Sequence, residues 1–589
     1  DPLRLLALGT DASFYRLTPK LAVKVRETAE VVRVVRACAA RGLPVTFRAA
    51  GTSLSGQAVT DSVLVILAGG FRDRQVLEGG ARVRLGPGVI GAEANALLAP
   101  YGRKLGPDPA SIGACMVGGI AANNASGMCC GTAQNSYQTL ESAVVVLADG
   151  TRLDTADPAS RDAFRATHPE LLHGLAALRD EVRADAALAE RIRRKYRIKN
   201  TTGYSLNAFV DFDDPFDVLL HLLVGSEGTL AFLAELTFRT VEEQAHKASA
   251  LVLYPDIEHA ARAVQRLDRQ VVAAAELMDR ASLRAVDGRP GMPEGLSALG
   301  PEACALLVEV RAASGAALPA AVDAAVARLA GVPTLGPVVF TAEKAAADRL
   351  WDIRKGLFPA VGAARRIGTT VIIEDVAFPM EHLAAGTVEL QRAFARHGYA
   401  EGIIFGHALD GNLHFVFTQD FGHPAEVARY QAFLDDVCAM VAGRFDGSLK
   451  AEHGTGRNMA PFVELEWGAA AYRVMRRVKA LLDPRGLLNP GVVLDDDPQA
   501  HLKHLKPLPP ADALVDQCIE CGFCEPKCPS RGLTATPRQR ITVTRELARL
   551  RATGADPARL ARLSADFRYW GEETCATDGL CATACPVGI

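Results

Sequence analysis

The sequence predicts a multidomain α+β protein with a separate, cysteine-rich α-helical domain at its C-terminal end. A chain of 589 residues is too long for one hydrophobic core, which favours three or more domains. Short β-like runs alternate with glycine-rich turns and amphipathic helical stretches over most of its length. Seven of the 13 cysteines lie between Cys518 and Cys585, after a charged, proline-rich segment that is typical of a linker.

The pattern of elements divides the chain into five parts. The first alternates β-like runs such as LAVKV (21–25) and DSVLVIL (61–67) with glycine-rich turns. The second begins again with a strand and an amphipathic helix and repeats that order, which predicts a second sheet with helices on one face. A helix at 468–482 follows, and two more helical runs accompany the cysteines. The boundaries we draw are 1–243, 244–460, 461–494, a linker at 495–512, and 513–589.

Composition narrows the functional class. The 65 basic and 68 acidic residues give a net charge of −3, which argues against a nucleic-acid partner or a polybasic membrane anchor. The chain has no apolar run near the ~18 residues that span a bilayer, so no transmembrane segment is predicted. An odd number of cysteines, 13, without an export signal favours a reducing compartment. We therefore expect a cytoplasmic protein, either free or docked on the inner face of the membrane.

The cysteine spacing at the C-terminal end is that of iron–sulfur proteins. The run CIECGFCEPKCPS (518–530) has the C-x2-C-x2-C-x3-C-P spacing of bacterial ferredoxins, whose fourth cysteine serves a second cluster. The run CATDGLCATACPVGI (575–589) has the same spacing with Asp578 at one cysteine position. The expected ligands of a 4Fe–4S cluster are Cys518, Cys521, Cys524 and Cys585. The expected ligands of a second cluster, 4Fe–4S or 3Fe–4S, are Cys528, Cys575 and Cys581, with Asp578 or no residue in the fourth position.

Structural zinc is the alternative reading of these cysteines, since one zinc ion needs only four such ligands. Two nested ferredoxin runs favour iron–sulfur clusters. The sequence begins without Met and stops four residues after Cys585, so we expect it to be part of a longer chain.

Three loops of the first part are rich in glycine and small hydroxyl residues: RAAGTSLSGQ (48–57), GGIAANNASG (118–127) and GSEGTLAF (225–232). Such loops let backbone N–H groups approach a phosphate. None matches the G-x-G-x-x-G or P-loop spacing, and each alone is more typical of a simple turn. With LGPDPAS (105–111), their order and spacing resemble the two-lobed, PCMH-type FAD domain of the vanillyl-alcohol-oxidase family.

This resemblance implies an FAD-binding domain over 1–243, to which the segment 461–494 returns. The first two loops would hold the pyrophosphate, 105–111 would lie beside the isoalloxazine, and 225–232 would close the adenine side. The loop 48–57 has no His for covalent attachment, so the FAD would be bound non-covalently. The contacts carried over by motif are Ala50, Gly51, Thr52, Ser53, Gly56, Gln57, Pro107, Ser111, Gly118, Gly119, Ala122, Asn123, Ser126, Gly127, Glu227 and Gly228.

The stretch GIIFGHALDGNLHFVF (402–417) predicts a β-hairpin turning at Asp410-Gly411. With a two-residue turn, His407 and His414 would face each other with Cβ atoms about 5 Å apart. Two imidazoles at that separation can share a divalent cation, and Glu452 in KAEHGTG (450–456) offers a carboxylate. The alternative is a pair of buried, hydrogen-bonded histidines without a metal.

These histidine motifs resemble the cap domain of the FAD-linked D-2-hydroxy-acid dehydrogenases. That resemblance implies an antiparallel cap sheet and a divalent metal, Zn, Mn or Fe, on His407, His414 and Glu452. It implies His453 as the catalytic base. Arg354 in WDIRKGLF would pair with the substrate carboxylate, although an arginine here could equally be a solvated surface charge. Some members have a lysine shortly before the D-x-x-x-P element, but here that region reads TTVIIEDVAFP.

With its cysteine-rich end, the whole chain most resembles bacterial fused flavin/iron–sulfur D-lactate dehydrogenases. The implied reaction is oxidation of D-lactate to pyruvate, with electrons passing through the clusters to a quinone, cytochrome or soluble acceptor. D-2-hydroxyglutarate and glycolate are alternative substrates. An electron-transfer subunit without its own substrate is the alternative from another class. The sequence leaves open the terminal acceptor, the metal and the oligomeric state.

Overall fold

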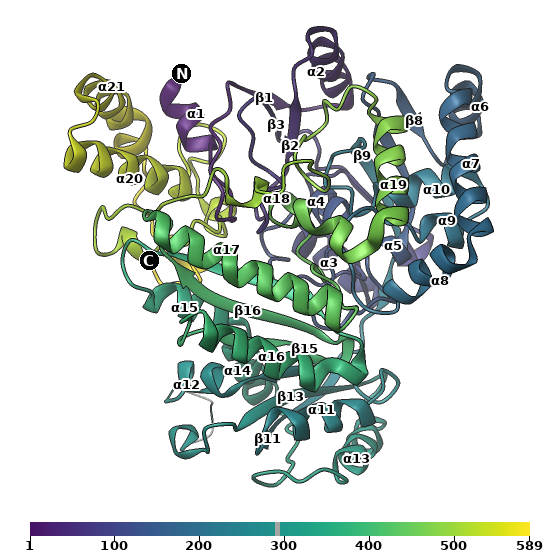
Figure 1. The fold of residues 1–589 in the computed structure, drawn as a ribbon, viewed down its shortest axis with the longest axis vertical. Coiled ribbons are helices and arrows are strands. Elements are labelled where there is room, and N and C mark those ends of the chain that lie inside the picture. The colour runs from purple at the N-terminus through teal and green to yellow at the C-terminus, as the bar shows by residue number, and fades with distance from the viewer. Residues whose placement is uncertain (289–291, 293–294) are drawn as a thin grey trace.

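The computed structural model describes residues 1–288, 292 and 295–589. An N-terminal domain and a cap domain lie one above the other in Figure 1, and the cysteine-rich domain lies beside the chain's first helix. That first helix, α1 (Pro2–Leu8), packs through Leu3 and Leu6 against α20 (Pro537–Thr553) and α21 (Pro557–Phe567). The two ends of the sequence therefore share one small hydrophobic core.

The first lobe of the N-terminal domain is a parallel sheet in the order β1 (Leu21–Val25), β3 (Val63–Leu67), β2 (Val45–Arg48). Helix α2 (Thr28–Arg41) joins β1 to β2 and ends at Gly42, whose φ of 66° is the left-handed conformation that glycine adopts most easily. The loop 48–57 leaves the carboxyl end of β2, the edge at which open α/β sheets place ligands.

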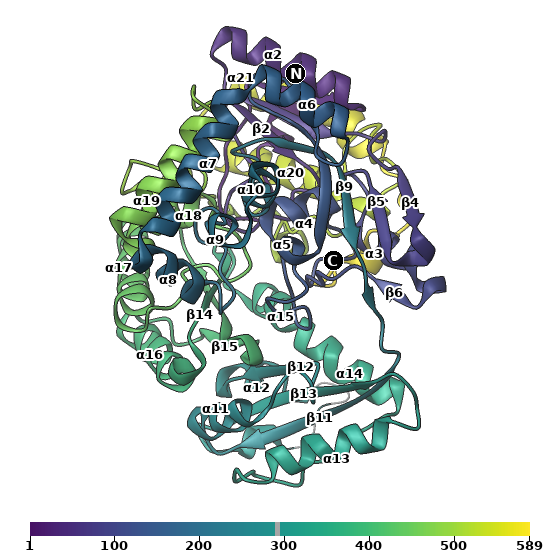
Figure 2. The ribbon, with the colours of Figure 1, turned by 90° about the vertical axis from the view of Figure 1, so that its right-hand side faces the viewer.

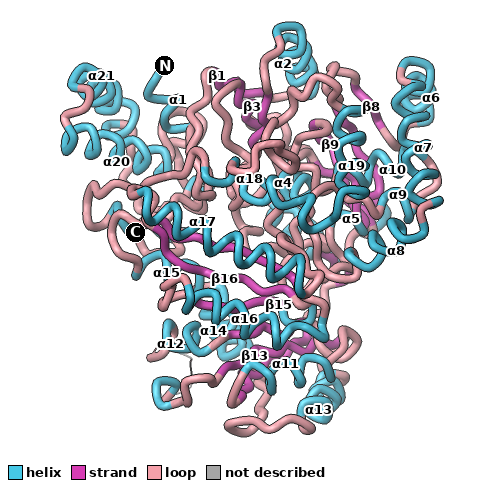
Figure 3. The backbone as a smooth tube through the Cα atoms, viewed as in Figure 1, coloured by secondary structure: helices cyan, strands magenta, loops and turns pink. Residues whose placement is uncertain are grey.

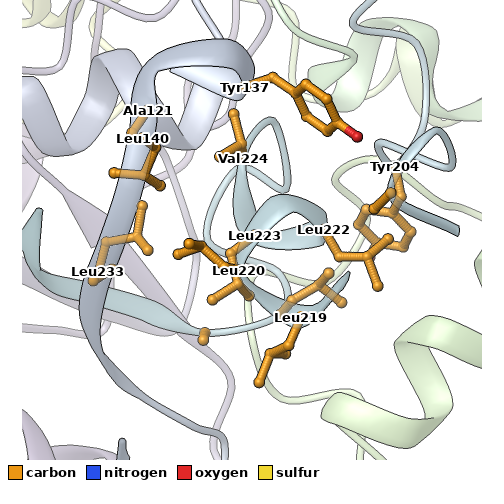
Figure 4. Packing of buried hydrophobic residues seen from close by; sticks show 14 of the residues in the cluster. Ala121, Tyr137, Leu140, Tyr204, Leu219, Leu220, Leu222, Leu223, Val224 and Leu233 are labelled. Carbon is orange, nitrogen blue, oxygen red and sulfur yellow. The ribbon is translucent and has the colours of Figure 1, made fainter. Parts of the chain in front are cut away.

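The second lobe is an antiparallel sheet in the order β4 (Arg74–Leu77), β5 (Arg82–Leu85), β9 (Phe232–Arg239), β7 (Leu140–Val146), β8 (Arg152–Asp154). Its core joins the sheet to the helices, as Figure 4 shows for Leu140, Leu219 and Leu222. The helices around it are α3 (Gly91–Leu98), α4 (Val117–Asn123), α6 (Pro158–Thr167), α7 (Pro169–Ala184), α8 (Ala186–Lys195) and α10 (Pro215–Leu223).

Helix α19 (Val463–Leu482) belongs to the N-terminal domain although it follows the cap domain in sequence. Trp467, Val474 and Met475 are buried in the same core as β7 and α10. Figure 1 shows α19, in green, among the blue helices of that domain. It is longer than the predicted helix at 468–482 and is interrupted at Gly468, which has a φ of 80°.

The cap domain is an antiparallel sheet that the chain enters after β9 and the short strand β10 (Val241–Glu242), and Figure 2 shows the chain running from β9 toward this sheet. Its strands lie in the order β11 (His246–Tyr254), β13 (Cys304–Ala312), β12 (Ala274–Met278), β15 (Ile403–His407), β16 (Asn412–Gln419), β14 (Thr370–Ala377). One face is covered by α11 (Ile257–Arg266), α13 (Leu318–Leu329), α16 (Leu383–Arg396) and α17 (Pro424–Cys438). Figure 3 shows α16 and α17 lying across the magenta strands.

The expectation that helices cover only one face of this sheet is wrong. Helices α14 (Lys344–Lys355) and α15 (Leu357–Ala364) pack on the opposite face through Trp351 and Leu357. The reason lies in the inner strands, because nearly every residue of β13 is buried and both of its faces need a covering layer.

The predicted register of the histidine hairpin is also wrong. Phe405, rather than His407, pairs with His414, and His407 instead pairs with Glu276 of β12. The loop is longer than two residues, with a 3-10 turn at Ala408–Asp410 before Gly411, whose φ is 64°. A shift of two residues preserves the face on which a side chain lies, so both histidines still point to the same side of the sheet.

The segment 495–512 is irregular, as expected of a linker, but it is not a free tether. Lys506 and His501 are buried, and Leu505 forms a bridge with Tyr15 near the start of the chain. Within the described ranges, none of the helices is both long and apolar enough to cross a bilayer.

Candidate active site

One cavity of about 530 Å³ lies where the N-terminal domain, the cap sheet and the cysteine-rich domain meet. Its volume is in the range of cofactor and ligand sites. All four loops predicted to hold FAD contribute to its wall, together with Arg354, His407, His414, Glu452 and His453. The predicted FAD contacts that line it are Ala50, Gly51, Thr52, Ser53, Gln57, Ser111, Gly118, Gly119, Ala122, Asn123, Ser126, Gly127, Glu227 and Gly228.

Gly56 and Pro107 are not among the described residues that line this cavity. Gly56 has a φ of 79°, and a Cβ atom there would lie 2.8 Å from the ring of Tyr15. This glycine therefore permits a close approach of Tyr15 to the loop. Pro109 and Ala110 take the place expected of Pro107 in the cavity wall.

The glycine loops also hold the segment that carries Glu452 and His453. Gln57 Nε2 donates to the carbonyl of His453 at 2.8 Å, and Asn123 Nδ2 donates to the carbonyl of Glu452 at 2.7 Å. Glu227 accepts from the backbone N–H of Gly456 at 2.9 Å. The loops that would bind the flavin thus set the position of the candidate base.

Three potential metal-ligand atoms converge beside this segment. His407 Nε2 lies 3.2 Å from His414 Nε2, and Glu452 Oε1 lies 3.1 and 3.3 Å from these two nitrogens. Atoms bound at ~2.1 Å to one tetrahedral ion lie ~3.4 Å apart, so the spacing fits a zinc-like or related divalent ion. All three side chains are largely buried. The set fits the predicted metal, because two imidazole nitrogens and one carboxylate oxygen are ligands that such an ion accepts.

Buried side chains hold two of the three ligands, His407 and Glu452, in the orientation that a metal needs. Glu276 Oε1 lies 2.7 Å from His407 Nδ1, which directs Nε2 toward the site. Lys199 Nζ and Ser126 Oγ donate to Glu452 Oε2 at 3.0 and 2.7 Å, which leaves Oε1 for a metal. Burial alone would raise the pKa of Glu452, but Lys199 and His407 hold it well below its usual range.

His453 lies next to the three ligands. Its ring stacks on that of His414, with centroids 5.0 Å apart and planes inclined by 20°. Its Nδ1 lies 3.2 Å from Asp375 Oδ1. Burial lowers the pKa of His453 to about 4, although Asp375 acts in the opposite direction, so the ring is neutral at pH 7 and can accept a proton.

Arg354 is buried in the cavity wall with only 5% of its surface exposed. Its guanidinium lies 4.3 Å above the ring of Phe405, and its Nη2 lies 2.5 Å from Glu276 Oε2. That contact lacks hydrogen-bond geometry, so among the described residues neither Nε nor Nη2 has a hydrogen-bond partner. Two adjacent N–H groups without hydrogen-bond partners, on Nε and Nη2 of Arg354, suit a carboxylate ligand that binds through both of its oxygens. Lys355 and Ile373 line the same cavity.

Sequence reasoning did not identify Glu276, Lys199 or Asp375. The sequence could have pointed to Glu276 and Asp375, because each is an acidic residue inside an otherwise apolar strand. Such a residue is rarely buried without a partner. Lys199 follows the basic end of α8 and looks like another surface lysine. Only the folded chain brings it to Glu452.

The cysteines form an inner and an outer group. The inner group is Cys518, Cys521, Cys524 and Cys585. Burial raises the pKa of the Cys521 thiol to about 11, and the charges of Cys518 and Cys585 add to the rise. The outer group is Cys528, Cys575 and Cys581. Arg540 links two parts of it, with Nη1 3.7 Å from Cys528 Sγ and Nη2 3.3 Å from the carbonyl of Thr574. Asp578 is exposed and accepts from the N–H of Leu580 at 3.1 Å.

Comparisons with known families agree with this division of the chain. Residues 19–156 match the model described as FAD binding domain, and residues 243–493 match FAD linked oxidases, C-terminal domain. Residues 514–589 match 4Fe-4S dicluster domain. The chain therefore combines an FAD-binding domain, the C-terminal domain of FAD-linked oxidases and a 4Fe–4S domain. These matches confirm the predicted fold class and the predictions of FAD and of a 4Fe–4S domain.

Individual relatives show which enzymes the chain is similar to. The D-2-hydroxyglutarate dehydrogenase of Pantoea ananatis (strain AJ13355) is 28% identical over 95% of this chain and 58% of the relative. Glycolate oxidase subunit GlcD of Bacillus subtilis (strain 168) is 25% identical, covering 82% of this chain and 90% of the relative. The Arabidopsis thaliana protein D-lactate dehydrogenase (cytochrome), mitochondrial, is 26% identical, covering 81% and 73%. The chain is thus similar, over most of its length, to proteins named for D-2-hydroxyglutarate, glycolate and D-lactate.

Two further facts qualify the likeness. The chain spans 58% of the length of the D-2-hydroxyglutarate dehydrogenases it matches from Pantoea ananatis and Escherichia coli (strain K12). Among solved structures, alkyldihydroxyacetonephosphate synthase superposes with a TM-score of 0.50 at 14% identity, over 80% of this chain and 75% of that one. That likeness shows the shared fold.

Proposed function

We propose that the protein is an FAD-dependent dehydrogenase of D-2-hydroxy acids that passes electrons to iron–sulfur clusters. The observation that carries the proposal is the convergence of His407, His414, Glu452, His453 and Arg354 on one cavity walled by the flavin-loop residues. A protein that only relays electrons has no use for a carboxylate-binding arginine beside a metal-and-base set.

The side chains divide the reaction between them. Arg354 pairs with the substrate carboxylate through its guanidinium N–H groups and fixes the orientation of the substrate. His453 accepts the hydroxyl proton, because burial keeps its ring neutral. A divalent ion held by His407, His414 and Glu452 would make that hydroxyl more acidic. FAD bound in the cavity would take up the hydrogen and the electron pair released from Cα.

For the substrate we propose D-lactate, which is oxidised to pyruvate. Ile373 and Phe405 give the cavity wall near Arg354 an apolar surface, which suits a short apolar side chain. D-2-hydroxyglutarate is a second candidate, because Lys355 lines the same cavity and could pair with a second carboxylate. The relatives named D-2-hydroxyglutarate dehydrogenase support this second substrate at least as well as the comparisons support D-lactate. Glycolate remains a third candidate. The electron acceptor that we propose is a quinone, a cytochrome or a soluble carrier.

The test is anaerobic mixing of the holoenzyme with D-lactate, L-lactate or D-2-hydroxyglutarate while the visible spectrum is recorded. D-lactate is expected to bleach the flavin band and part of the iron–sulfur absorbance, and L-lactate is expected to do neither. Bleaching by D-2-hydroxyglutarate alone would keep the enzyme class and overturn the substrate. Reduction by dithionite but by no hydroxy acid would favour an electron-transfer subunit.

A pair of histidine variants separates catalysis from folding. His453→Asn is expected to slow bleaching by about 10²–10⁴-fold, the usual contribution of a general base. His423→Asn is the matched control, because the side chain of His423 is 74% exposed. Equal bleaching rates in the two variants would remove His453 from the mechanism.

A further inference from the structure

Arg365, at the end of α15, brings a positive charge to the loop that carries most of the inner cysteine group. Its guanidinium donates to the carbonyl of Gln517 at 3.0 Å and to that of Cys518 at 2.9 Å. It also donates to the carbonyls of Gly362 and Thr369 in the cap domain. Among the residues that the structure describes, its acceptors are all backbone oxygens and it forms no ion pair with a carboxylate. The cap domain therefore places an unneutralised cation beside a predicted cluster ligand.

Arg545, on α20, brings a second cation to the same carbonyl. Its side chain is 1% exposed, and its Nη2 donates to the carbonyl of Cys518 at 2.8 Å and to that of Val515 at 3.1 Å. Its Nη1 donates to the carboxylate of Glu520 at 2.6 Å. Two arginines from different domains thus meet at Cys518.

Glu520 does not balance these charges, because three cations share it. Its carboxylate is fully buried and lies 3.3 Å from Lys506 Nζ and 3.4 Å from Arg16 Nη2, in addition to its contact with Arg545. Asp11 is a second buried carboxylate whose charge acts on Lys506. These three cations and the one at the end of α15 therefore face two buried carboxylates, and positive charge remains in excess around the loop.

The backbone of the loop suits a sulfur ligand. Glu520 has a φ of 57°, which is uncommon for a residue with a side chain, and its N–H donates to Cys518 Sγ at 3.3 Å. Hydrogen bonds to sulfur and net charge are both features that set the potential of an iron–sulfur cluster. The neighbouring Arg538 pairs with Glu525 and adds no net charge. These contacts fit a cluster on the inner cysteines and leave the excess of cations in place.

We propose that Arg365 and Arg545 raise the reduction potential of the cluster held by the inner cysteine group. A cluster bound by four thiolates is negatively charged, and reduction adds one more negative charge. Buried cations stabilise that added charge strongly, because the effective dielectric constant around them is low. This inference rests on the part of the proposed function that assigns these cysteines to a cluster, and it does not depend on which hydroxy acid is oxidised.

The alternative is that Arg365 only caps a helix. It follows the last turn of α15, and its bond to the carbonyl of Gly362 is typical of such a cap. A capping arginine acts through its hydrogen bonds, whereas an arginine that sets a potential acts through its charge. Two variants separate these roles, because Arg365→Lys keeps the charge but loses the planar set of donors, and Arg365→Gln loses both.

The test is a potentiometric titration of the intact protein with dithionite, in which EPR follows each cluster signal and no hydroxy acid is present. Arg365→Gln and Arg545→Gln are each expected to lower the midpoint potential of one signal by at least 59 mV, which is a tenfold smaller equilibrium constant for one-electron reduction. Arg365→Lys is expected to keep the native midpoint. Arg549→Gln is the control on the same helix as Arg545, because its pair is partly exposed, and it is expected to match the native protein.

The signal that shifts is expected to be the one that Cys521→Ser alters. Native midpoints in both arginine-to-glutamine variants, or a shift confined to the signal that Cys575→Ser alters, would overturn the proposal. Equal shifts in Arg365→Lys and Arg365→Gln would show that Arg365 is a helix cap. Glu520→Gln is expected to raise the midpoint, because it removes a negative charge, and a lower midpoint there would contradict the electrostatic role.

The two proposals fail in different ways. Dithionite supplies the electrons, so the titration decides the role of the arginines even if no hydroxy acid reduces the protein. A midpoint potential does not depend on how much cluster is bound, so partial loss of iron leaves the result valid. If Arg545→Gln or Glu520→Gln does not fold, the two Arg365 variants decide, because Arg365 is only half-buried.

Discussion

Glu276 is the residue on which two parts of the site depend. One carboxylate oxygen lies 2.7 Å from His407 Nδ1 and the other lies 2.5 Å from Arg354 Nη2. Burial would raise the pKa of this fully buried group, but His407 and Arg354 lower it to about 2. A charged Glu276 therefore orients two residues at the same time: His407, the proposed metal ligand, and Arg354, the proposed partner of the substrate carboxylate.

Replacing Glu276 by glutamine tests this double role. Glu276→Gln is expected to weaken binding of the divalent metal by about 10–100-fold, the usual effect of losing a carboxylate behind a histidine ligand. The KM for the hydroxy acid is expected to rise as well, because Arg354 loses its anionic neighbour. Both are measured on purified protein, by metal titration and by initial rates. The matched control is Glu309→Gln on the adjacent strand, where the carboxylate pairs with Arg311. Unchanged metal affinity in Glu276→Gln would refute the role.

Glu227, in the third flavin loop, gives a pH-dependent prediction. Burial raises the pKa of this carboxyl to about 8, although hydrogen bonds from Gly456 and Gln57 act in the opposite direction. The folded protein therefore binds more protons than the unfolded chain between the model-peptide value of ~4.3 and pH 8, so stability falls as pH rises through this window.

Glu227→Gln removes this titration and keeps the shape of the side chain. Relative to the native protein, the variant is expected to gain stability from about pH 5 to pH 8, on the order of 3 kcal/mol in total, and to gain no more above pH 8. Thermal unfolding of both proteins from pH 5 to pH 9 measures the difference. A difference that does not change with pH would show that Glu227 is charged in the fold.

At the scale of elements, Arg538 of α20 joins the cysteine-rich domain to the first flavin loop. Arg538, at the second position of this helix, is 4% exposed and joins the carbonyls of Ala50 and Gly51 to Glu525. The helix begins with a capping box, in which Thr536 accepts from Gln539 N and the Gln539 side chain accepts from Thr536 N. This capping box fixes the conformation of the first turn of α20, and hence the direction in which the Arg538 side chain points.

Arg538→Gln is expected to destabilise the junction by about 3 kcal/mol, because it leaves Glu525, whose side chain is only 15% exposed, without its cation. Limited proteolysis is expected to cut between 495 and 518 faster than in the native protein, and FAD is expected to dissociate more readily from the loosened first loop. Arg549→Gln on the same helix is the control, because its pair with Glu546 is partly exposed. Equal cleavage rates in the two variants would contradict the anchoring role.

At the scale of the whole molecule, the candidate metal site joins two domains. His407 and His414 belong to the cap sheet, whereas Glu452 is held by Lys199 and Ser126 of the N-terminal domain. An ion bound across them binds the folded chain and not the unfolded one. It would stabilise the fold by about 2.7 kcal/mol when its concentration is 100 times its dissociation constant.

Removal of the ion by a chelator is therefore expected to lower the unfolding temperature by a few degrees, and re-addition of Zn²⁺ or Mn²⁺ is expected to restore it. Glu452→Gln is expected to unfold at the same temperature with and without chelator. His453→Asn is expected to retain the response, because His453 is not one of the three ligands. If a chelator does not change the unfolding temperature of the native protein, His407 and His414 are a hydrogen-bonded pair without a metal.

The sequence by itself determined the features that depend on local chemistry. Cysteine spacing identified a 4Fe–4S domain because three cysteines of a C-x2-C-x2-C-x3-C-P run bind one cluster from a single short loop. The order of the glycine loops identified an FAD domain, and the family matches confirm both. The pair of histidines on one face also followed from the period of two along a strand, even though the predicted register was wrong by two residues.

Only the tertiary structure decided which distant residues meet. Glu276 reaches His407 because β12 lies beside β15, an arrangement that no local pattern specifies. Lys199 and Glu452 are 253 positions apart and meet at 3.0 Å. Cys521 enters the cavity wall because both the flavin domain and the cap domain bind its loop through arginines. Such contacts arise from the packing of whole elements, and for that reason they cannot be read from residue spacing along the chain.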